Sequence, residues 1–496
     1  MSKGEFSMKK ISNILQFILF ALPLVLFGTA MVLYTTFHGV DFRTVIMQMT
    51  VPSTIGNPVG TFKILFTGCL WGAPLFFISL FYYHKHPKTQ SRICFSLVLT
   101  MLVLCISYTI LPGFSETVQE AGEYSTIYEE YYVSPEDVKI TFPEGKNNLL
   151  VIYLESMEQN YKASSNGHNY IPHLTELQEE SHSFSSSSGA GILPVNGAAF
   201  TLGALISSSS GITYNFPTEY FSSGRNYDNL EKSTFRHRSE SVFMNDAVVL
   251  GDILKSAGYY NEFICGTDAD FAGRAEYYKR HNYDKISDIK ILTEEYSVEK
   301  EIVANFDAIS DAYMYDILKE RIKEAEEKEQ PWHIDFLSVN THQPNGYLCE
   351  FCSQEYESDI ENAISCADKL IYNFIEWAKT QEWYDNTTIV ILGDHPFMGK
   401  NPIIDDVEAQ RSTINIFINS KGAKNATEKP RDFCQLDMFP TFLGAIGAQI
   451  EGDRLGLGAN LYSEEATLVE RLNYEYVNSQ LGMRSQMHNN KFRIEV

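Results

Sequence analysis

The sequence predicts an α-helical membrane anchor of three transmembrane helices, followed by an α/β/α sandwich with a mostly parallel sheet. Three observations predict this class. Residues 11–37, 64–83 and 93–115 contain no charged side chain. From residue 149 onward, short apolar runs alternate with longer amphipathic segments. The charge is also divided, because residues 1–112 carry eight basic and two acidic residues within a chain of net charge −24. A small basic, apolar head joined to a large acidic body is not one globule.

Each uncharged stretch is long enough to cross a hydrocarbon core of about 30 Å at roughly 1.5 Å per residue. The predicted helices are 14–36, 64–83 and 93–112, so residues 1–112 form the anchor. The first stretch is too long for a cleaved signal peptide, and two more follow it.

The basic residues beside the helices predict the orientation of the anchor. Lys9 and Lys10 precede the first helix, and Lys85, Lys88 and Arg92 lie between the second and third. Positively charged short loops remain in the cytoplasm, which places the N-terminus inside and everything after residue 112 outside. The acidic body also argues against a nucleic-acid partner, which would require a basic face.

The body divides into three parts. Residues 113–148 are acidic and tyrosine-rich and contain two prolines, which predicts a juxtamembrane linker. Residues 149–462 form the expected catalytic domain, and 463–496 a C-terminal tail or extension. Within the domain we expect buried strands at 149–154, 334–339 and 387–392 and helices at 241–256 and 362–380. This alternation is typical of a parallel sheet covered by helices on both faces.

Charged side chains follow two of the expected strands. Glu155 comes directly after 149–154, and Asp394 and His395 come after 387–392. Parallel sheets gather ligands at the carboxyl ends of their strands. Buried carboxylates are costly unless they are paired or bind a cation, so the three residues predict a site for Mn²⁺, Mg²⁺ or Zn²⁺. The alternative for each residue alone is a helix cap or a turn.

Thr201 follows a Gly/Ala/Pro-rich loop, residues 189–199, and opens a short apolar helix. Backbone N–H groups at a helix N-terminus favour negative charge such as a phosphoryl group. A hydroxyl near a divalent ion loses its proton more readily and becomes a nucleophile. The alternative is a threonine that only caps the helix.

The body contains five cysteines, Cys265, Cys349, Cys352, Cys366 and Cys434. The Cys349-x-x-Cys352 pair fits half of a zinc site or a redox pair, but no second pair of this spacing follows. The alternative, which we predict, is a disulfide joining Cys366 to Cys349 or Cys352. Because five is odd, at least one thiol stays free or pairs between molecules.

Several segments together resemble a known family. They are NLLVIYLESMEQNY, AFTLGALISSSSGI, FAGRAEYYKRHNYDKI, NTHQPNGY, ILGDH and LDMFPTFLGAIGA…RLGLGANL, in this order over about residues 140–462. The set resembles the phosphoglycerol transferases of the alkaline phosphatase/sulfatase superfamily. These include the lipoteichoic acid synthases and, with greater similarity, the phosphoglycerol transferase I enzymes of osmoregulated periplasmic glucans. The resemblance implies an alkaline phosphatase-like fold.

The resemblance also implies roles for individual residues. The implied ligands of one metal ion, Mn²⁺ in the better-known relatives, are Glu155, Thr201, Asp394 and His395. Thr201 would be the nucleophile that becomes phosphoglycerylated. Arg274 would contact the glycerol phosphate as a bidentate donor. His342 would hydrogen-bond the transferred phosphate or carry a proton.

Four further positions qualify the resemblance. Ala272 stands where lipoteichoic acid synthases carry an aromatic residue, which weakens the case for a polymerase. Phe200 stands where the glucan-modifying enzymes tend to carry Trp. Glu158 and Asp437 lie near motifs, and we expect them to cap or orient neighbouring elements rather than to bind metal.

The implied activity is a transfer of sn-glycerol 1-phosphate from phosphatidylglycerol to an extracytoplasmic glycan or polymer hydroxyl, with release of diacylglycerol. The protein would lie in the bacterial cytoplasmic membrane, with its catalytic domain outside. One alternative is a phosphoethanolamine transferase or a sulfatase-type hydrolase, although the C/S-x-P-x-R setting of sulfatases is absent from the sequence. A second alternative is a catalytically inert, glycan-binding envelope protein.

Overall fold

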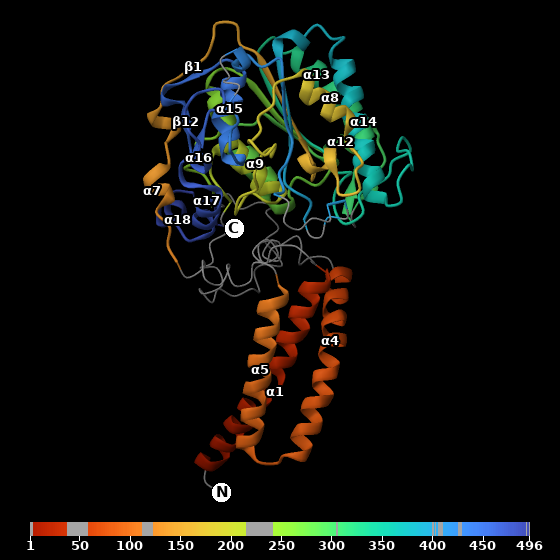
Figure 1. Cartoon of the computed structure of the whole chain (residues 1–496), viewed down its shortest axis with the longest axis vertical. Coiled ribbons are helices and arrows are strands. Elements are labelled where there is room, and N and C mark those ends of the chain that lie inside the picture. Colours follow the sequence, from red (N-terminus) through yellow and green to blue (C-terminus); the bar gives the residue numbers. More distant parts are fainter. Residues whose placement is uncertain are drawn as a thin grey trace. The chain divides into compact units, whose positions relative to one another are not determined.

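The computed structural model divides the chain into two compact units, Met1–Gln119 and Glu120–Val496 (Figure 1). The described residues are 3–36, 58–111, 123–214, 242–303, 306–398, 401, 403–404, 410–424, 429–492 and 494–495.

The first unit has three long helices in the places that the sequence predicts. They are α1 (Lys3–Thr36), α4 (Pro58–Lys85) and α5 (Thr89–Ile110). Their segments Gln16–Thr35, Phe66–Lys85 and Thr89–Ile110 are long and apolar enough to cross a membrane. Helices α1 and α4 approach closely at two glycines, since a Cβ on Gly28 would lie 2.6 Å from the carbonyl oxygen of Gly68. The orientation stays a prediction, and the loop 37–57 lies outside the described residues.

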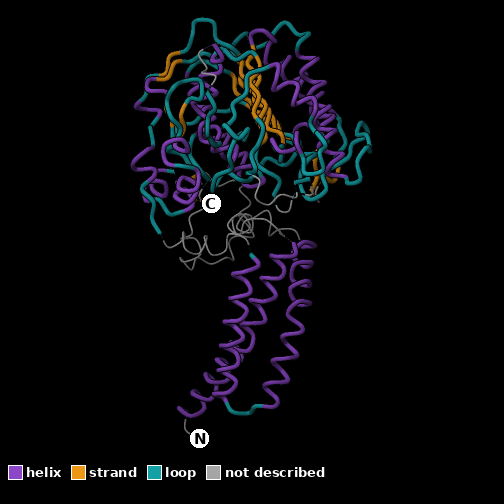
Figure 2. Tube along the Cα trace, viewed as in Figure 1, coloured by secondary structure: helices purple, strands orange, loops and turns teal. Residues whose placement is uncertain are grey.

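The second unit contains a six-stranded sheet in the order β10-β9-β2-β8-β4-β5 (Figure 2). Its strands are β2 (Asn148–Leu154), β4 (Tyr260–Cys265), β5 (Lys285–Ser287), β8 (Trp332–Leu337), β9 (Thr387–Gly393) and β10 (Asn415–Ile418). All neighbours are parallel except β10, which is antiparallel to β9. The three expected strands are therefore confirmed, and they lie side by side at the centre.

The remaining helices and strands surround this sheet. They are α7 (Ile127–Tyr131), β1 (Ile140–Thr141), α8 (Pro172–Glu180), α9 (Thr201–Ser210), β3 (Val242–Phe243), α10 (Leu250–Ser256), α11 (Arg274–Arg280), α12 (Ile289–Tyr296), β6 (Glu301–Val303), β7 (Phe306–Ala308), α13 (Asp311–Glu326), α14 (Asp359–Ala378), α15 (Met438–Ala445), β11 (Gln449–Ile450), β12 (Arg454–Leu455), β13 (Gly458–Ala459), α16 (Leu468–Leu472), α17 (Tyr474–Gly482), α18 (Gln486–Lys491) and β14 (Ile494–Glu495).

Helices cover both faces of the sheet, as expected for an α/β/α sandwich (Figure 1). On β2, Leu150, Ile152 and Leu154 belong to the apolar core that includes α8, α13 and α14. Side chains alternate along a strand, so Tyr153 faces the other way, and its hydroxyl lies 2.9 Å from that of Ser208 on α9. Every residue of β2 is buried because both faces are covered.

The expected helix over 241–256 is only partly correct. Residue 241 lies outside the described residues, and Val242–Phe243 forms strand β3, paired with Ile494–Glu495 near the end of the chain. The helix α10 begins only at Leu250. The pairing of two segments so distant in sequence leaves no local signal.

Part of the expected linker also belongs to the second unit. Residues 112–122 lie outside the described residues, but Tyr128 of α7 is fully buried, and its hydroxyl lies 2.9 Å from that of Thr213. Strand β1 pairs with β11. The linker expected at 113–148 is thus too long, because Tyr128 is buried in the second unit and strand β1 is paired within it.

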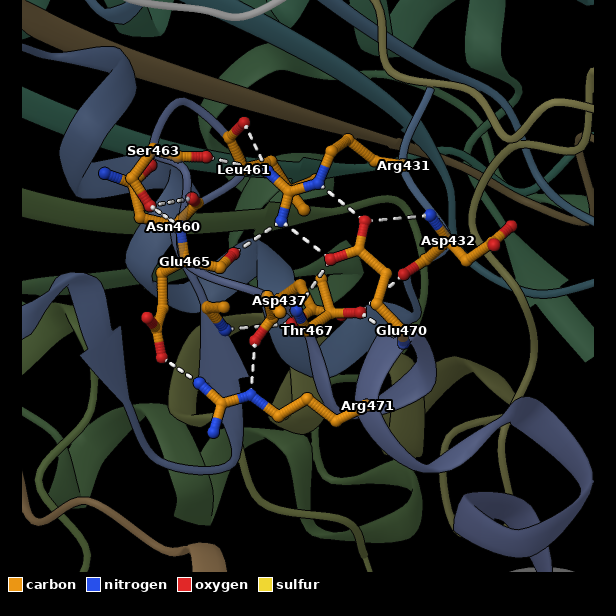
Figure 3. A network of polar contacts seen from close by, with 12 residues as sticks. Arg431, Asp432, Asp437, Asn460, Leu461, Ser463, Glu465, Thr467, Glu470 and Arg471 are labelled. Atoms are coloured by element: carbon orange, nitrogen blue, oxygen red, sulfur yellow. Dashed lines mark hydrogen bonds and ion pairs between the residues drawn. The ribbon is translucent and has the colours of Figure 1, made fainter. Parts of the chain in front are cut away.

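The C-terminal residues 463–496 pack into the same unit through a polar network around Arg431 (Figure 3). The guanidinium of Arg431 donates to the Glu470 carboxylate, at 2.8 and 3.1 Å, and to the carbonyl oxygens of Leu461, Ser463 and Glu465. Arg431 is 3% exposed. Because a buried cation needs its partners, the extension is an integral part of the domain.

Candidate active site

The parallel pairing of β2 with β9 brings the predicted acidic residues together. Leu154 is paired with Gly393, and these residues immediately precede Glu155 and Asp394. The two carboxylates therefore leave adjacent strands at the same edge of the sheet. Glycine is required at 393, since a Cβ there would lie 1.9 Å from the carbonyl oxygen of Met157.

Glu155, Asp394 and His395 form one buried cluster whose ligand atoms all lie within 4.8 Å of one another. The Nε2 atom of His395 lies 3.4 Å from Glu155 Oε1 and 3.4 Å from Asp394 Oδ2. The Nδ1–H of His395 donates to the carbonyl oxygen of Pro396 at 2.8 Å, which leaves Nε2 directed at the two carboxylates. An imidazole held in this way presents Nε2 to a metal ion.

Thr201, at the start of α9, also lies beside this cluster. It is the first residue of α9, and the preceding N-cap residue is Phe200, whose side chain makes no capping hydrogen bond. The Thr201 hydroxyl lies 3.4 Å from Glu155 Oε2 and 3.3 Å from His395 Nε2. Thr201 is thus not the N-cap residue of α9, and its hydroxyl lies beside Glu155 and His395.

Close packing of the loop before α9 places the threonine. A Cβ on Gly203 would lie 2.3 Å from the carbonyl oxygen of Gly197 and 2.7 Å from the ring of Phe200. Only glycine allows the first turn of the helix to approach the loop this closely. The ring of Phe200 fills this space.

Ser156 orients both carboxylates. Its backbone N–H donates to Asp394 Oδ1 at 2.8 Å, and its hydroxyl donates to Glu155 Oε1 at 2.7 Å. Its φ of 51° is in the left-handed region, a strained conformation for a serine. Ser156 was not among the residues predicted from the sequence, although its place directly after Glu155 was a possible signal.

The second oxygen of Asp394 shows that this cluster fits a cation. Asp394 Oδ2 is buried and has no hydrogen-bond partner among the described residues, and such an oxygen is costly. The residues fit a hard divalent cation, because two carboxylates, an imidazole nitrogen and a hydroxyl offer it oxygen and nitrogen donors.

The electrostatics of the cluster agree with this fit. Burial, and then the charge of Glu155, raise the pKa of Asp394 to about 7. Burial also raises the pKa of Glu155, but the charges of His395 and His342 and two hydrogen bonds outweigh it, so that this pKa is lowered overall. Burial lowers the pKa of His395, and the charges of Asp394 and Glu155 raise it more strongly. The two carboxylates are thus close enough to repel each other, and a bound metal ion would offset this repulsion.

His342 lies close enough to act electrostatically on Glu155 and follows strand β8 in the loop 338–342. Its Nδ1–H donates to the carbonyl oxygen of Gln343 at 2.8 Å. Asp311 fixes the loop by accepting from the backbone N–H groups of Val339, at 2.8 Å, and Asn340, at 2.9 Å. Asp311 lies far from His342 in sequence and carried no signal for this role.

Arg274 begins α11, beyond the carboxyl end of β4. It is 6% exposed, and its Nη2 donates to Thr267 Oγ1 at 2.9 Å and to the carbonyl oxygen of Asp268 at 2.8 Å. Its Nε is buried without a partner among the described residues. Arg274 therefore lies at the same edge of the sheet, but these contacts do not connect it to the cluster of Glu155.

Glu158 and Asp437 orient neighbouring elements, as the sequence predicts. Glu158 accepts from the guanidinium of Arg411 and from the backbone N–H of Phe397, at 3.0 Å. It thereby ties the segment after β2 to the segment after β9. Asp437 accepts from the backbone N–H groups of Cys434 and Ala459, at 3.0 and 2.9 Å.

The sequence of this chain is similar to those of known proteins. The Sulfatase family model matches residues 147–448. Phosphoglycerol transferase I of Escherichia fergusonii is 26% identical over 397 residues, which cover 76% of this chain and 48% of that protein. The protein of the same name from Salmonella choleraesuis is 27% identical over 478 residues, 90% of this chain and 57% of that protein. The chain thus spans about half the length of these relatives.

A solved structure supports the fold. A protein in the alkaline phosphatase superfamily from Vibrio parahaemolyticus superposes with a TM-score of 0.50 at 17% identity. The superposition covers 72% of this chain and 80% of that one. At this identity the comparison concerns the fold alone, and it confirms the predicted alkaline phosphatase-like sandwich.

Proposed function

The chain belongs to the Sulfatase family, and from this premise we propose that it is a membrane-bound, metal-dependent phosphotransferase. It takes glycerol phosphate from phosphatidylglycerol, releases diacylglycerol and passes the group to the hydroxyl of an extracytoplasmic glycan or polymer. The donor and the acceptor class are proposed from the relatives named phosphoglycerol transferase I and from the family motifs. Three apolar helices suit an enzyme whose donor is a lipid.

One observation carries the proposal: the Thr201 hydroxyl lies within 3.4 Å of both Glu155 and His395, at the N-terminus of a helix. A hydroxyl so placed is a candidate nucleophile, since a neighbouring carboxylate accepts its hydrogen bond. The backbone N–H groups of the first turn of α9 favour a phosphoryl group beside it. A catalytically inert binding protein does not require a hydroxyl held between a carboxylate and an imidazole at a helix N-terminus.

The proposed metal ligands are Glu155, Thr201, Asp394 and His395. A divalent ion, Mn²⁺ by the resemblance and Mg²⁺ or Zn²⁺ as alternatives, would lower the pKa of the threonine hydroxyl and offset phosphoryl charge when bound. Ser156 holds the two carboxylates at fixed positions for it, through the bonds at 2.8 and 2.7 Å.

The reaction proceeds in two displacements at phosphorus. Thr201 Oγ1 passes its proton to Glu155 and attacks the phosphate of the lipid, and the diacylglycerol oxygen leaves with a proton from His342. In the second step His342 takes the proton of the acceptor hydroxyl, which attacks the phospho-threonine, and the Thr201 oxygen leaves and recovers its proton from Glu155. Arg274 binds the phosphate or the glycerol of the transferred group.

Intact-protein mass measurement tests this proposal. The full chain in detergent is incubated with Mn²⁺ and phosphatidylglycerol, without acceptor, and then digested to locate any adduct. We expect one glycerol-phosphate adduct on Thr201 and an equivalent amount of diacylglycerol. Phosphatidylethanolamine in a parallel reaction distinguishes the donors, since an ethanolamine-phosphate adduct alone would favour the phosphoethanolamine transferase. Hydrolysis with no adduct, retained in Thr201→Ala, would refute the covalent mechanism.

A further inference from the structure

Three cysteines outside the candidate active site lie in mutual contact. Cys352 and Cys366 form a disulfide. The Sγ atom of Cys349 lies 3.4 Å from that of Cys352 and 3.8 Å from that of Cys366. The predicted bridge to Cys366 is thus confirmed with Cys352 as the partner, and a free thiol touches both of its sulfurs.

The cluster joins two elements of the unit. Cys349 and Cys352 lie in the loop that follows β8, and Cys366 lies on α14. Cys349 packs with Ala312 and Cys366 in a small apolar cluster and is 8% exposed. This packing holds the third thiol beside the disulfide.

We propose that Cys349, Cys352 and Cys366 form a thiol–disulfide exchange site, in which one disulfide is shared among three cysteines. A thiolate exchanges with a disulfide by direct attack on one of its sulfur atoms. Cys349 Sγ contacts both sulfurs, so it attacks either one. The disulfide then shifts to Cys349–Cys352 or to Cys349–Cys366.

The exchange is balanced without any external reagent. The Cys349 thiol loses its proton, and its Sγ forms a bond with the Sγ of Cys352 while the Cys352–Cys366 bond breaks. The electron pair of the broken bond stays on Cys366 Sγ, which takes up a proton. Attack on Cys366 releases Cys352 in the same way. Neither shift changes the oxidation state of the cluster, because one disulfide and one thiol remain.

The two products differ in how they attach the loop. The Cys349–Cys366 bond keeps the loop linked to α14, whereas the Cys349–Cys352 bond lies within the loop and removes this link. Backbone bonds connect the loop to the candidate active site, because Gly346 donates to the carbonyl oxygen of His342 at 2.9 Å and Tyr347 to that of Asn340 at 2.7 Å. Exchange therefore changes the covalent support of the segment that carries His342.

The position of the free thiol tests the proposal. The full chain in detergent is held at about pH 8 without reductant, then acidified, denatured and treated with a maleimide, because exchange requires the thiolate and stops in acid. Peptide mapping without reduction locates the label. We expect one label per cluster in each molecule, divided among Cys349, Cys352 and Cys366. Cys349→Ser should reduce the label on the other two about tenfold or more, since it removes the attacking thiol.

Two buried thiols provide internal controls. Cys265 and Cys434 are free and lie outside the cluster, so we expect label on each and no disulfide to either. Label on Cys349 alone in the wild-type protein, with the Cys352–Cys366 bond intact in every molecule, would overturn the proposal. Three labels on the cluster of one molecule, with or without bound Zn²⁺, would also overturn it, because no disulfide would then be present.

Discussion

Raising the pH in the absence of divalent metal should destabilise the second unit, and Mn²⁺ should remove most of this effect. The pKa of Asp394 is about 7 in the folded protein, against an ordinary value of 3.8. The folded state therefore holds this proton more tightly than the unfolded state does, and the stability present at low pH is lost as the pH rises through 7. Between pH 5 and pH 7, two pKa units correspond to about 3 kcal/mol.

The shifted pKa values of His395 and Glu155 also make the stability depend on pH. The pKa of His395 is raised above 6.5, so its contribution is also lost as the pH rises through the folded value. The pKa of Glu155 is lowered from 4.5, so its contribution is gained as the pH rises through that range and is nearly complete by about pH 5. Above about pH 5 the Glu155 contribution no longer changes, and the change of His395 has the same sign as that of Asp394.

Thermal unfolding of the full chain in detergent measures the effect. Tryptophan fluorescence reports mainly on the second unit, since Trp332, Trp377 and Trp383 lie in it and Trp71 lies in the anchor. A loss of about 3 kcal/mol corresponds to a decrease in Tm on the order of 4 °C for a unit of this size. We expect this decrease from pH 5 to pH 8 with chelator and little or none with Mn²⁺.

Asp394→Asn is the matched variant because it removes the titrating carboxyl at nearly constant size. Asp311, with a pKa of about 7, and Asp437, with a pKa of about 6, titrate in both proteins and cancel in the comparison. The variant should show a smaller pH dependence without metal and a smaller gain from Mn²⁺. Equal pH dependence in both proteins, or an equal gain from Mn²⁺, would refute the assignment of Asp394 to a cation site.

Three further predictions concern separate parts of the molecule. Thr201→Ala should lower diacylglycerol release by about 10³-fold or more while changing the free energy of unfolding by only about 1 kcal/mol. Thr201→Ser should retain measurable release, and a near wild-type rate in the Ala variant would exclude Thr201 as the nucleophile. Arg431→Ala should cost about 3 kcal/mol in denaturant unfolding, because it removes the cation from the partly buried Glu470 carboxylate and the hydrogen bonds to three carbonyl oxygens. Arg471→Ala, which breaks a partly exposed ion pair with Glu465, should cost less than about 1 kcal/mol. Protease added to spheroplasts should degrade the second unit and spare residues 85–92, and the reverse pattern would invert the predicted topology.

The local pattern of the sequence determined the layers of this protein and the identity of its acidic cluster. Uncharged apolar runs mark the three long helices, because each is long enough to cross a membrane. They also mark the central strands β2 and β9, because burial on both faces favours a continuous apolar run. The third, β8, is marked less clearly because it contains Asp335. The sequence also predicted that Glu155 and Asp394 lie close together, because each follows a strand and parallel strands end at the same edge of a sheet. The motifs around Thr201 and His395 added a family and expected roles.

The tertiary structure decided whether those residues meet and which segments belong to the domain. The choice between a capping hydroxyl and one directed at Glu155 depends on the packing of α9 against its loop, through Gly203, and no spacing in the sequence expresses it. Burial of Tyr128 and pairing of β3 with β14 likewise depend on partners far along the chain. Such contacts form only when the chain closes on itself, so the sequence near each segment reports its own propensity and not the partner that will cover it.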